Sequence, residues 1–406
     1  MASAGKEEFA MNIFQRRAVR FLIPAFLLIL LPSFGIATER RQLVVGTNGA
    51  DCRGASFKSI QSAVDAASPG DSIRVCKGVY PEQLSITKSV DIEPDPGVFV
   101  VPLALKQNAT GLATGVPIAA AIIVSGAADV SIADLTVDGI NNAVTGCAPR
   151  VEGIYYQNAS GEISRVVVRN FRLGPSLGGC QSGTGILIES GNGSSSHVEI
   201  RKCVIHDFQK NGITANEIGT YVRVHGNVVT GLGPTNGAAQ NGIQIGFGAN
   251  GEVSQNMVTN TVWSGCIDVS TCSAVATSIL VAESDGVKVS ENLLSDAQVN
   301  IFIVGNLGAV SGNQVFNSRV FDGIRIEGNN YLVSRNRITS AGEALIFIQG
   351  DENEVTHNRL SDATIGILKS TGSFNNNFDH NEFDHVAIPI QDPPTNSLVG
   401  LIIPDR

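Results

Sequence analysis

Hydrophobic and polar residues alternate in short segments that recur along the second half of the chain. One segment has a hydrophobic residue, two polar residues and an asparagine before the next hydrophobic residue, as in VSQNMV, VSRNRI and VTHNRL. The asparagines are spaced by 29, 36, 21, 23, 22 and 23 residues, so the later cycles are regular and the earlier ones carry insertions. They are Asn227, Asn256, Asn292, Asn313, Asn336, Asn358 and Asn381. A repeat of this length is typical of a solenoid, in which each unit stacks on the next.

A second segment has the alternation expected of a short β-strand. It reads GIQIG, NIFIVG, GIRIEG and LIFIQG in successive cycles. In GIRIEG the alternation places Ile324 and Ile326 on a buried face, and Arg325 and Glu327 on the outer face. The intervals leave no room for the helices of about 10 to 15 residues that alternate with strands in a βαβ protein. The chain is therefore predicted to be all-β, a solenoid whose coils of about 22 residues bury their apolar faces by stacking.

The repeated asparagine has two explanations. Equivalent residues of successive coils lie above one another, about 4.7–4.9 Å apart, so an inward asparagine can hydrogen-bond to the turns on either side and form an amide ladder. Alternatively, each asparagine is an ordinary turn residue that tolerates a left-handed backbone. Seven in register favour the ladder. One coil upstream, Cys203 takes the asparagine's place, and a small buried side chain suits a position that faces inward.

The N-terminal residues have the features of an export signal. The basic run RRAVR precedes the apolar run FLIPAFLLILLPSF, and small residues follow up to Ala37. This order predicts a cleaved signal peptide over residues 1–37. A membrane anchor is the alternative, but Pro24 and Pro32 interrupt the apolar run, which is shorter than the roughly 20 residues that span a bilayer. We expect a secreted or periplasmic protein with no membrane span after cleavage.

Removal of this segment makes the chain more acidic. Residues 1–37 contain four basic and two acidic residues, so 24 basic and 35 acidic groups remain, with a formal net charge of −11. This charge argues against a nucleic-acid partner, because phosphate binding requires a basic surface.

Seven cysteines follow the signal segment, and export permits disulfides. No CxxC occurs and the spacings match no zinc site, so we expect no metal site. The sequence does not determine the connectivity. The nearest neighbours would pair as Cys52 with Cys76, Cys147 with Cys180 and Cys266 with Cys272, which leaves Cys203 unpaired.

The segment before the coils predicts a cap within residues 38–100, which we assign to the cap and the first coil. Ser56 is a suitable N-cap, and apolar residues at i, i+3, i+4 and i+7 from Ile60 predict a helix over residues 57–67. Pro69 and Gly70 end it. Laid across the first coil, the helix would cover the open apolar end of the solenoid.

The run IQSAVDAASPGDSIRVCKGVYPEQLSI resembles the opening of the right-handed parallel β-helix proteins of the pectin lyase-like superfamily. In those proteins a capping helix leads to a Gly-x-Tyr-x-Glu turn, which corresponds here to Gly78, Tyr80 and Glu82. The resemblance implies a single-stranded right-handed parallel β-helix over residues 101–395 and a C-terminal tail over residues 396–406. The fold hosts several activities, so it does not identify one.

No enzyme of the superfamily has its complete catalytic pattern here. The chain lacks the full set of hydrolase motifs, the later pectin methylesterase elements, the RxPxxR-like stretch of pectate lyases and the DPHD of alginate epimerases. Whether the protein is an enzyme stays open; an enzymatic form would be a polysaccharide lyase, an epimerase or a glycoside hydrolase. We expect no cofactor, and no motif supports a Ca²⁺ site.

Basic side chains recur on the outer face of the later coils. Guanidinium groups bind carboxylates through paired hydrogen bonds, so this surface could receive uronic acids. The alternative is a solvated rim whose arginine stems cover the turns. Phe302 and Phe347, in the coils next to Arg325, could stack on sugar rings or cover a loop. The candidate substrate-binding residues are Arg325, Arg335, Arg337, His357 and Arg359.

One pair of carboxyl groups is a candidate for catalysis. Asp322 and Glu343 fall one coil apart on the predicted stack and could form a glycosidase pair, although the sequence does not give their separation.

These features predict an exported monomer that binds or processes an extracytoplasmic, possibly acidic polysaccharide. The alternative is a non-catalytic periplasmic or surface scaffold that serves adhesion or the maturation of another protein. An enzyme requires an acid and a base in register beside a groove, whereas a scaffold requires only the ladder.

Overall fold

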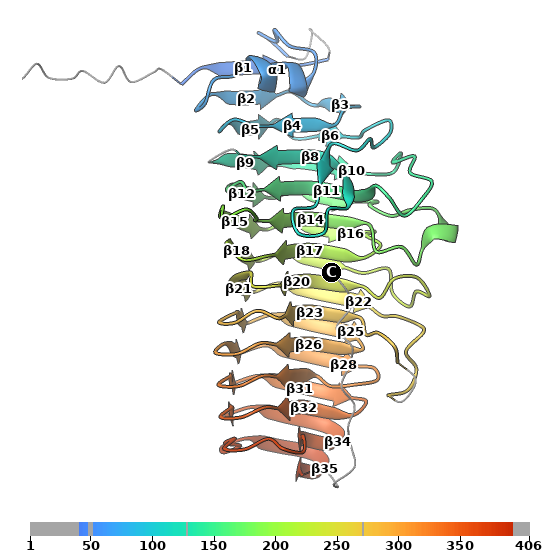
Figure 1. Ribbon diagram of the computed structural model, residues 1–406, viewed down its shortest axis with the longest axis vertical. Helices are drawn as coiled ribbons and strands as arrows, with labels where there is room; N and C mark the ends of the chain where they lie inside the picture. Colours follow the sequence, from blue (N-terminus) through green and yellow to red (C-terminus); the bar gives the residue numbers. More distant parts are fainter. Residues whose placement is uncertain (1–39, 48–51, 127–128, 270–271, 393–406) are drawn as a thin grey trace, which may run out of the picture. The chain divides into compact units, whose positions relative to one another are not determined.

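The computed structural model describes residues 40–47, 52–126, 129–269 and 272–392. The predicted signal peptide over residues 1–37 and the tail over residues 396–406 lie outside this part of the chain. Strands dominate the described residues, which also contain the helix α1 (Ile60–Ala66) and the 3₁₀ helix η1 (Pro175–Leu177). Figure 1 shows the strands stacked in successive coils. Within the described part, no helix is long and apolar enough to cross a lipid bilayer.

Each regular coil contributes three short strands, one to each face of the stack. The first face is a sheet of twelve parallel strands. Neighbouring strands pair in register, as Val310 does with Val333 and Val333 with Val355. The strands are β1 (Gln42–Val45), β2 (Ser72–Val75), β5 (Asp91–Pro94), β9 (Val130–Ala133), β12 (Gly161–Ser164), β15 (Ser196–Arg201), β18 (Thr220–His225), β21 (Asn250–Ser254), β24 (Lys288–Ser290), β27 (Ala309–Ser311), β30 (Leu332–Ser334) and β33 (Glu354–Thr356).

The second face follows the asparagine turn. Its strands also pair in parallel, for example Ile338 with Val315 in the coil before and Leu360 in the coil after. They are β3 (Gly78–Tyr80), β6 (Val98–Val100), β10 (Leu135–Asp138), β13 (Val167–Arg169), β16 (Val204–His206), β19 (Val228–Thr230), β22 (Met257–Thr261), β25 (Leu293–Ala297), β28 (Gln314–Ser318) and β31 (Arg337–Ala341).

The third face holds the strands of the GIxI segment. They are β4 (Leu84–Ile86), β8 (Pro117–Ser125), β11 (Arg150–Gln157), β14 (Thr184–Glu189), β17 (Asn211–Asn216), β20 (Asn241–Gly246), β23 (Thr277–Ala282), β26 (Val299–Val304), β29 (Ile324–Glu327) and β32 (Ala344–Gln349). Two long strands, β34 (Arg359–Lys369) and β35 (Glu382–Gln391), run through the second and third faces. The short strand β7 (Ala109–Thr110) pairs antiparallel with β8.

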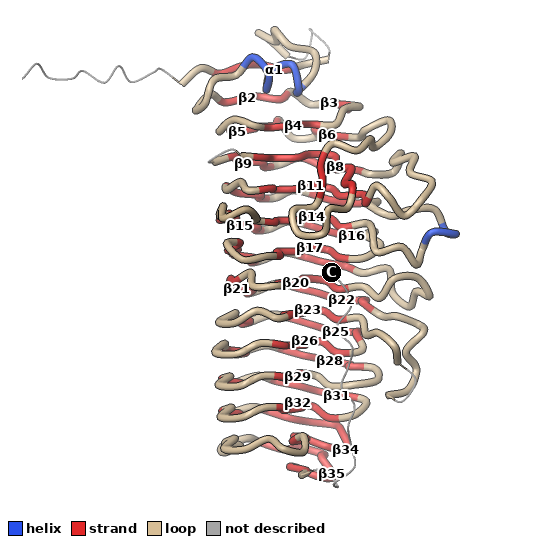
Figure 2. Tube along the Cα trace, viewed as in Figure 1, coloured by secondary structure: helices blue, strands red, loops and turns tan. Residues whose placement is uncertain are grey.

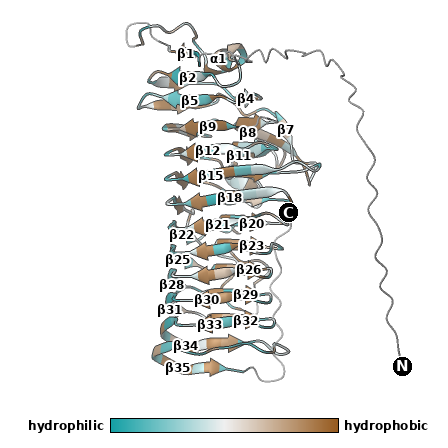
Figure 3. Cartoon of the chain, turned by 90° about the vertical axis from the view of Figure 1, so that its left-hand side faces the viewer, coloured by the Kyte–Doolittle hydropathy of each residue, from teal (hydrophilic) through white to brown (hydrophobic). Residues whose placement is uncertain are grey.

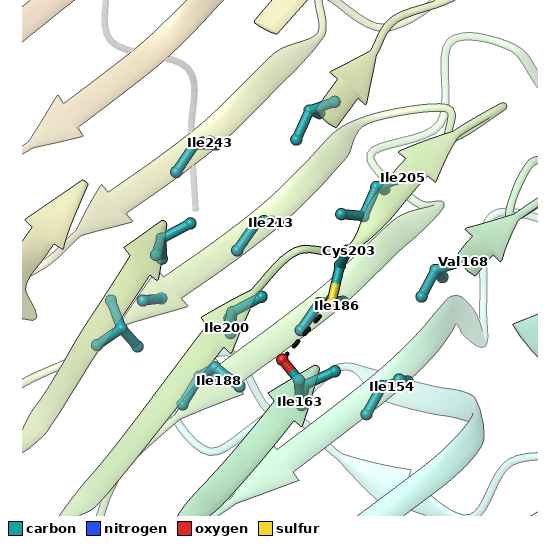
Figure 4. Close-up of a cluster of buried hydrophobic side chains, with 14 of the residues drawn as sticks. Ile154, Ile163, Val168, Ile186, Ile188, Ile200, Cys203, Ile205, Ile213 and Ile243 are labelled. Carbon is teal, nitrogen blue, oxygen red and sulfur yellow. Dashed lines mark hydrogen bonds between the residues drawn. The ribbon is translucent and has the colours of Figure 1, made fainter. Parts of the chain in front are cut away.

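The core is built from columns of identical positions. Inward isoleucines of the third face stack in register through nine coils, and each is fully buried. Figure 4 shows part of this stack, and Figure 3 shows the hydrophobic colouring of the strands. Each such side chain contributes about 1.5–3 kcal/mol by leaving water. The column is Ile154, Ile186, Ile213, Ile243, Ile279, Ile301, Ile324, Ile346 and Ile367.

The predicted asparagine ladder is confirmed between the first and second faces. Each asparagine donates from Nδ2 to the Oδ1 of the next, at 2.9–3.0 Å from Asn227 through Asn381. The same Oδ1 also accepts the backbone N–H of the preceding asparagine, as between Asn336 and Asn358 at 3.0 Å. Nδ2 donates again to a backbone carbonyl of the coil before, as from Asn336 to Val310 at 2.9 Å. The side-chain amide and the backbone N–H of an asparagine within the ladder therefore all have hydrogen-bond partners.

The left-handed residue of each turn is the one before the asparagine. Arg335 has φ 55° and His357 has φ 58°, whereas the asparagines that follow them, Asn336 and Asn358, have negative φ. The asparagines are thus retained for hydrogen bonding and not for backbone tolerance. Upstream, Cys203 takes the position, and its Sγ lies 3.5 Å from the Ile163 carbonyl (Figure 4).

The N-terminal cap is confirmed, but the helix begins later than predicted. Ser59, not Ser56, is the N-cap, and its Oγ accepts from the Ser62 N–H at 3.1 Å. The Glu82 carboxylate accepts from the backbone N–H groups of Ile60 and Gln61 at 2.7 and 3.0 Å. Glu82 therefore satisfies the first free donors of the helix, and its charge complements the helix dipole. This explains the glutamate of the Gly-x-Tyr-x-Glu turn.

The structure contains the three nearest-neighbour disulfides. They are Cys52–Cys76, Cys147–Cys180 and Cys266–Cys272, and Cys203 is free and buried. The first lies beside the cap, and the other two lie in loops that leave the coils.

Thiol counting checks this pairing. We expect one reactive thiol in denatured, unreduced protein and almost none in the native protein, because burial raises the pKa of the Cys203 thiol to about 11 and shields it. Full reduction before denaturation is the control and should release seven thiols. Three or more thiols without reduction would contradict the pairing.

Loop length divides the stack into two halves. Several connections between the second and third faces are long in the first half, as at residues 139–149, 170–183, 231–240 and 262–276, although residues 207–210 form a short one. Residues 342–343 make the same connection in a later coil. Figure 2 shows the long loops on one side of the stack. The long loops therefore flank the third face in the first half of the stack.

Candidate functional site

Four of the predicted binding residues meet in one surface hollow, which we name the arginine rim: Arg335, Arg337, His357 and Arg359. The hollow has a volume of about 480 Å³ and is also lined by Gln314. All four rim side chains are exposed. Parallel pairing places Arg337 directly beside Arg359.

Neighbouring coils limit the rim at both ends. Gln314 pairs with Arg337 on one side, and Glu382 pairs with Arg359 on the other. Arg359 Nε lies 3.0 Å from the Glu382 carboxylate. The His357 ring stacks on His380, with 5.0 Å between ring centroids and 5° between planes. The rim therefore presents three guanidinium groups and one carboxylate.

Arg325 does not belong to this surface, and the prediction that it is exposed was wrong. Its side chain leaves the coil outward as predicted, yet it is only 1% exposed. The guanidinium carbon lies 3.8 Å from the Phe347 ring centroid and 5.8 Å from that of Phe302. Both rings are also buried, so the aromatic residues cover an arginine instead of offering a sugar platform.

Of the two carboxyl candidates, Asp322 is fully buried beside Arg325, and Glu343 is partly buried and feels the charge of Arg325. Arg325 donates from Nη1 to the Asp322 carboxylate at 3.0 Å and from Nε to Glu327 at 2.7 Å. Burial raises the pKa of Asp322, Arg325 opposes this effect, and Glu343 adds to it. Burial likewise raises the pKa of Glu343, and Arg325 lowers it. Asp322 is fully buried and bonded to Arg325 and to the Ala344 N–H, so its geometry is that of a structural carboxyl.

The structure also reveals a site that the sequence analysis missed, which we name the Glu152 cavity. It lies on the outer side of the third face and has a volume of about 70 Å³. Its charged lining residues are Arg150, Glu152 and Lys210. Polar residues complete much of the wall: Gln181, Thr184, Asn211, Thr214, Asn216 and Gln244.

Burial changes the proton affinity of two cavity groups in opposite directions. Desolvation raises the pKa of Glu152 to about 8, although Thr184 and Arg150 act to lower it. Desolvation lowers the pKa of Lys210 to about 8, and the positive charge of Arg150 lowers it further. Near neutral pH the cavity therefore holds a protonated carboxyl group beside two cations.

A repeated triplet was the overlooked signal for this site. A polar residue, glycine and isoleucine recur as Glu152-Gly153-Ile154, Thr184-Gly185-Ile186, Asn211-Gly212-Ile213 and Asn241-Gly242-Ile243. A Cβ on Gly153 would lie 2.3 Å from the Gly185 carbonyl oxygen, and the same collision recurs down the stack. Asn211 and Asn241 enter a buried amide network on the outer side, as Asn211 does with Gln244 at 3.1 Å, and Glu152 and Thr184 hold the same position in the two coils before them.

The described residues do not form a metal site. Among them, no three His, Cys, Asp or Glu side chains come together in an arrangement that could hold a metal ion. Cys203 is enclosed in the core, and the stacked pair His357 and His380 has no third ligand.

These features define the class of the protein. The chain has a right-handed parallel β-helix fold, as the capping motif and the stacked parallel strands predicted. Residues 235–392 match the family model described as "Periplasmic copper-binding protein (NosD)". No curated protein sequence matches the chain.

Solved structures share this fold at low sequence identity. The GH136 lacto-N-biosidase from Eubacterium ramulus is 12% identical with a TM-score of 0.55, and the match covers 86% of this chain and 68% of the enzyme. The mannuronan C-5 epimerase AlgE4 A-module of Azotobacter vinelandii is 15% identical with a TM-score of 0.52, over 84% of this chain and 94% of the module. The Dettilon tailspike protein is 13% identical with a TM-score of 0.51, over 81% of this chain and 64% of the tailspike. Such similarity establishes the fold alone.

Proposed function

We propose that this protein is an exported, monomeric β-helix protein that binds an acidic polysaccharide along the arginine rim. The observation that carries the proposal is the clustering of Arg335, Arg337 and Arg359 around one open hollow of about 480 Å³. Guanidinium groups one strand apart repel one another in the free protein. A chain of carboxylated sugars would relieve this repulsion and offer each arginine a paired acceptor.

The remaining charged surface supports the choice of the rim. On the first face, arginines pair with carboxylates of adjacent coils, as Arg74 does with Asp95 at 3.0 Å. Arg165 and Arg201 likewise pair with Asp134 and Glu162. Arg335 and Arg337 have no salt bridge to any residue that the structure describes. Their positive charges are therefore not neutralised by a carboxylate and can bind an anionic ligand, although the chain as a whole has a formal net charge of −9.

The comparisons are consistent with an extracytoplasmic glycan ligand. The matched family model carries the word periplasmic in its description, which fits the export signal predicted for residues 1–37. The mannuronan epimerase of the same fold acts, by its name, on a polymer of an acidic sugar. We infer binding without turnover at the rim, because its nearby carboxylate, Glu382, is occupied by Arg359.

A polyuronate array tests the proposal. Wild-type protein should bind polygalacturonate or alginate, more weakly at high salt, and should not bind neutral dextran. Arg337→Ala/Arg359→Ala should weaken binding at least about tenfold, since a hydrogen bond to a charged group contributes about 1.5–3 kcal/mol. Biolayer interferometry on immobilised glycans measures both effects.

The matched control removes two arginines that are already paired. Arg165→Ala/Arg201→Ala changes the net charge equally but lies several coils away from the rim, in β15 and in the turn after β12, so it should leave polyuronate binding within about twofold. Equal losses in both double variants would indicate a general charge effect, and unchanged binding in the rim variant would remove the rim as the site. Absence of binding by the wild type would leave the non-catalytic scaffold as the better explanation.

A further inference from the structure

Lys210 is a buried lysine that lacks a carboxylate partner. It lies directly before β17 and is 8% exposed. Its ammonium group donates to the Ala239 carbonyl at 2.8 Å, and no other side-chain hydrogen bond or salt bridge joins it to a residue that the structure describes. Lysines are almost never buried to this extent without an ion pair, because loss of hydration penalises the charged amine. The position therefore favours a reaction that removes the positive charge.

The backbone of Lys210 is fixed between two coils. Its N–H group donates to the Gly183 carbonyl at 2.9 Å in the coil before, and its carbonyl accepts from the Asn241 N–H group at 3.0 Å in the coil after. The Ala239 carbonyl holds the other end of the side chain. Lys210 also lines the Glu152 cavity, so its amine is presented to the cavity from a fixed position.

The Glu152 cavity has room for a small group on this amine. Its volume of about 70 Å³ corresponds to roughly two water molecules, and a carboxyl group with three heavy atoms is no larger. Arg150 supplies a positive charge at the cavity. Glu152 is 2% exposed, and its Oε2 atom has no hydrogen-bond partner among the described residues, although buried polar atoms seldom lack one. A carboxylate attached to Lys210 would therefore meet a cation and an atom that requires a hydrogen bond.

Lys210 is also more reactive than an ordinary lysine. Desolvation, aided by the positive charge of Arg150, lowers the pKa of Lys210 to about 8. The usual lysine pKa is about 10.4, so the neutral fraction at neutral pH is larger by roughly two orders of magnitude. Only the neutral amine has the lone pair that attacks an electrophile.

We propose that Lys210 is a modification site that reacts reversibly with carbon dioxide to form a carbamate in the Glu152 cavity. The amine nitrogen attacks the carbon of CO₂, an N–C bond forms, and the electron pair of one C–O π bond moves to oxygen. The nitrogen then releases one proton to bulk water, so the product has one negative charge and nothing is oxidised or reduced. The Arg150 guanidinium balances this charge, and protonated Glu152 donates a hydrogen bond to the carbamate. The proposal does not depend on the arginine rim.

Few titratable groups surround Lys210. β17, β20 and the loop over residues 231–240 contain none. On the other neighbouring elements the titratable or charged side chains are Arg150, Glu152, Tyr155, Arg172, Glu189, His206 and Asp207. Glu189 already accepts hydrogen bonds from Tyr155 and from two backbone N–H groups, and Asp207 pairs with Arg172 and His206. Arg150 and Glu152 are therefore the groups that the carbamate meets.

Formation of the carbamate should depend on pH in a defined direction. The ammonium group must lose its proton before it reacts, so at a fixed CO₂ pressure the carbamate fraction should rise between about pH 6 and pH 8. Burial raises the pKa of Glu152 to about 8, so above this pH its carboxyl group is ionised and opposes the carbamate. The rise should therefore become shallower above about pH 8.

Carbon-13 NMR of the full chain in ¹³C-labelled bicarbonate tests the proposal. Wild-type protein should show a carbamate resonance in addition to the one that the α-amino group of the chain gives. Lys210→Met should remove this resonance, whereas Lys288→Met, which removes an exposed lysine that pairs with Glu252, should keep it. Ethylation of the carbamate with triethyloxonium, followed by mass spectrometry of the peptides, should place the modification on Lys210.

Two further variants keep the test independent of any folding defect in Lys210→Met, which thermal unfolding checks. Arg150→Met should lower the carbamate fraction at least about tenfold, because it removes the balancing charge. Glu152→Gln keeps a hydrogen-bond donor and should change the fraction by less than about threefold. A wild-type spectrum without this resonance, ethyl carbamate found only at other lysines, or an unchanged fraction in Arg150→Met would overturn the proposal. Lys210→Met should still bind polyuronate, so failure of either proposal leaves the other intact.

Discussion

Replacing Arg325 by methionine is expected to destabilise the protein by about 3–5 kcal/mol at pH 8, because it leaves buried carboxylates without their cation. The guanidinium bonds Asp322 and Glu327 and lies 3.8 Å from the centroid of the Phe347 ring. Methionine fills much of the same space between the aromatic rings, so the loss reports mainly on charge. Guanidinium chloride titration measures the free energy of unfolding.

The loss should shrink at acid pH. Burial raises the folded-state pKa of Asp322 above its unfolded value of about 3.9. A carboxyl group of this kind binds its proton more tightly in the folded state, so its unfavourable effect is absent below about pH 4 and grows until its folded pKa is passed. Removal of Arg325, which acts to lower that pKa, enlarges the effect. The difference between variant and wild type should thus be smaller at pH 5 than at pH 8.

Two variants serve as controls. Arg319→Met removes an exposed arginine that pairs with Asp296 at 3.0 Å, and should cost less than about 1 kcal/mol. Asp322→Asn/Arg325→Met removes both charges and should recover part of the stability, because neutral replacements of a buried ion pair are often well tolerated. A loss for Arg325→Met that equals the Arg319→Met value and does not vary with pH would show that the cluster is solvated.

Asn336→Ala is expected to lower the free energy of unfolding by about 1–3 kcal/mol. Its Oδ1 accepts two hydrogen bonds from Asn313, and its Nδ2 donates to Val310 and Asn358. Alanine leaves buried donors and acceptors of three coils unpaired, and no water can reach them directly. The measurement is again guanidinium chloride titration, followed by far-UV circular dichroism.

The last member of the ladder provides the comparison. Asn381 donates to Val355 and accepts from Asn358, but no further asparagine follows it in the described part of the stack. It is also less buried than Asn336. Asn381→Ala should therefore cost less than Asn336→Ala. A loss of less than about 0.5 kcal/mol in the free energy of unfolding for Asn336→Ala would contradict the view that the ladder stabilises the stack.

Much of the candidate rim could be predicted because register in a solenoid is set by the repeat. Alignment of Arg337 with Arg359 required only the 22-residue interval between Asn336 and Asn358, and the paired strands confirm it. The same reasoning placed Arg325 correctly between its aromatic neighbours. The same reasoning predicted the solvent exposure of Arg325 wrongly. A strand pattern gives the direction in which a side chain points, but it does not give the residues that cover that side chain.

The Glu152 cavity could not be predicted from the repeat for a related reason. Its charged residues come from a strand and from the end of a connecting loop in another coil, and the sequence does not give the paths of such loops. The helix start also shifted because Glu82, 22 residues away, supplies the capping carboxylate. Contacts of this kind are formed by the folded chain and leave only faint local signals.

By itself, the sequence determined the all-β solenoid, the stacked asparagines and the column of arginines, because a periodic pattern maps directly onto a stack of identical coils. The tertiary structure alone decided which outward side chains reach water. Arg325 and Lys210 became buried while Arg337 and Arg359 stayed exposed. The physical reason is that desolvation depends on everything packed around a group, and repeat register specifies only its neighbours within the stack.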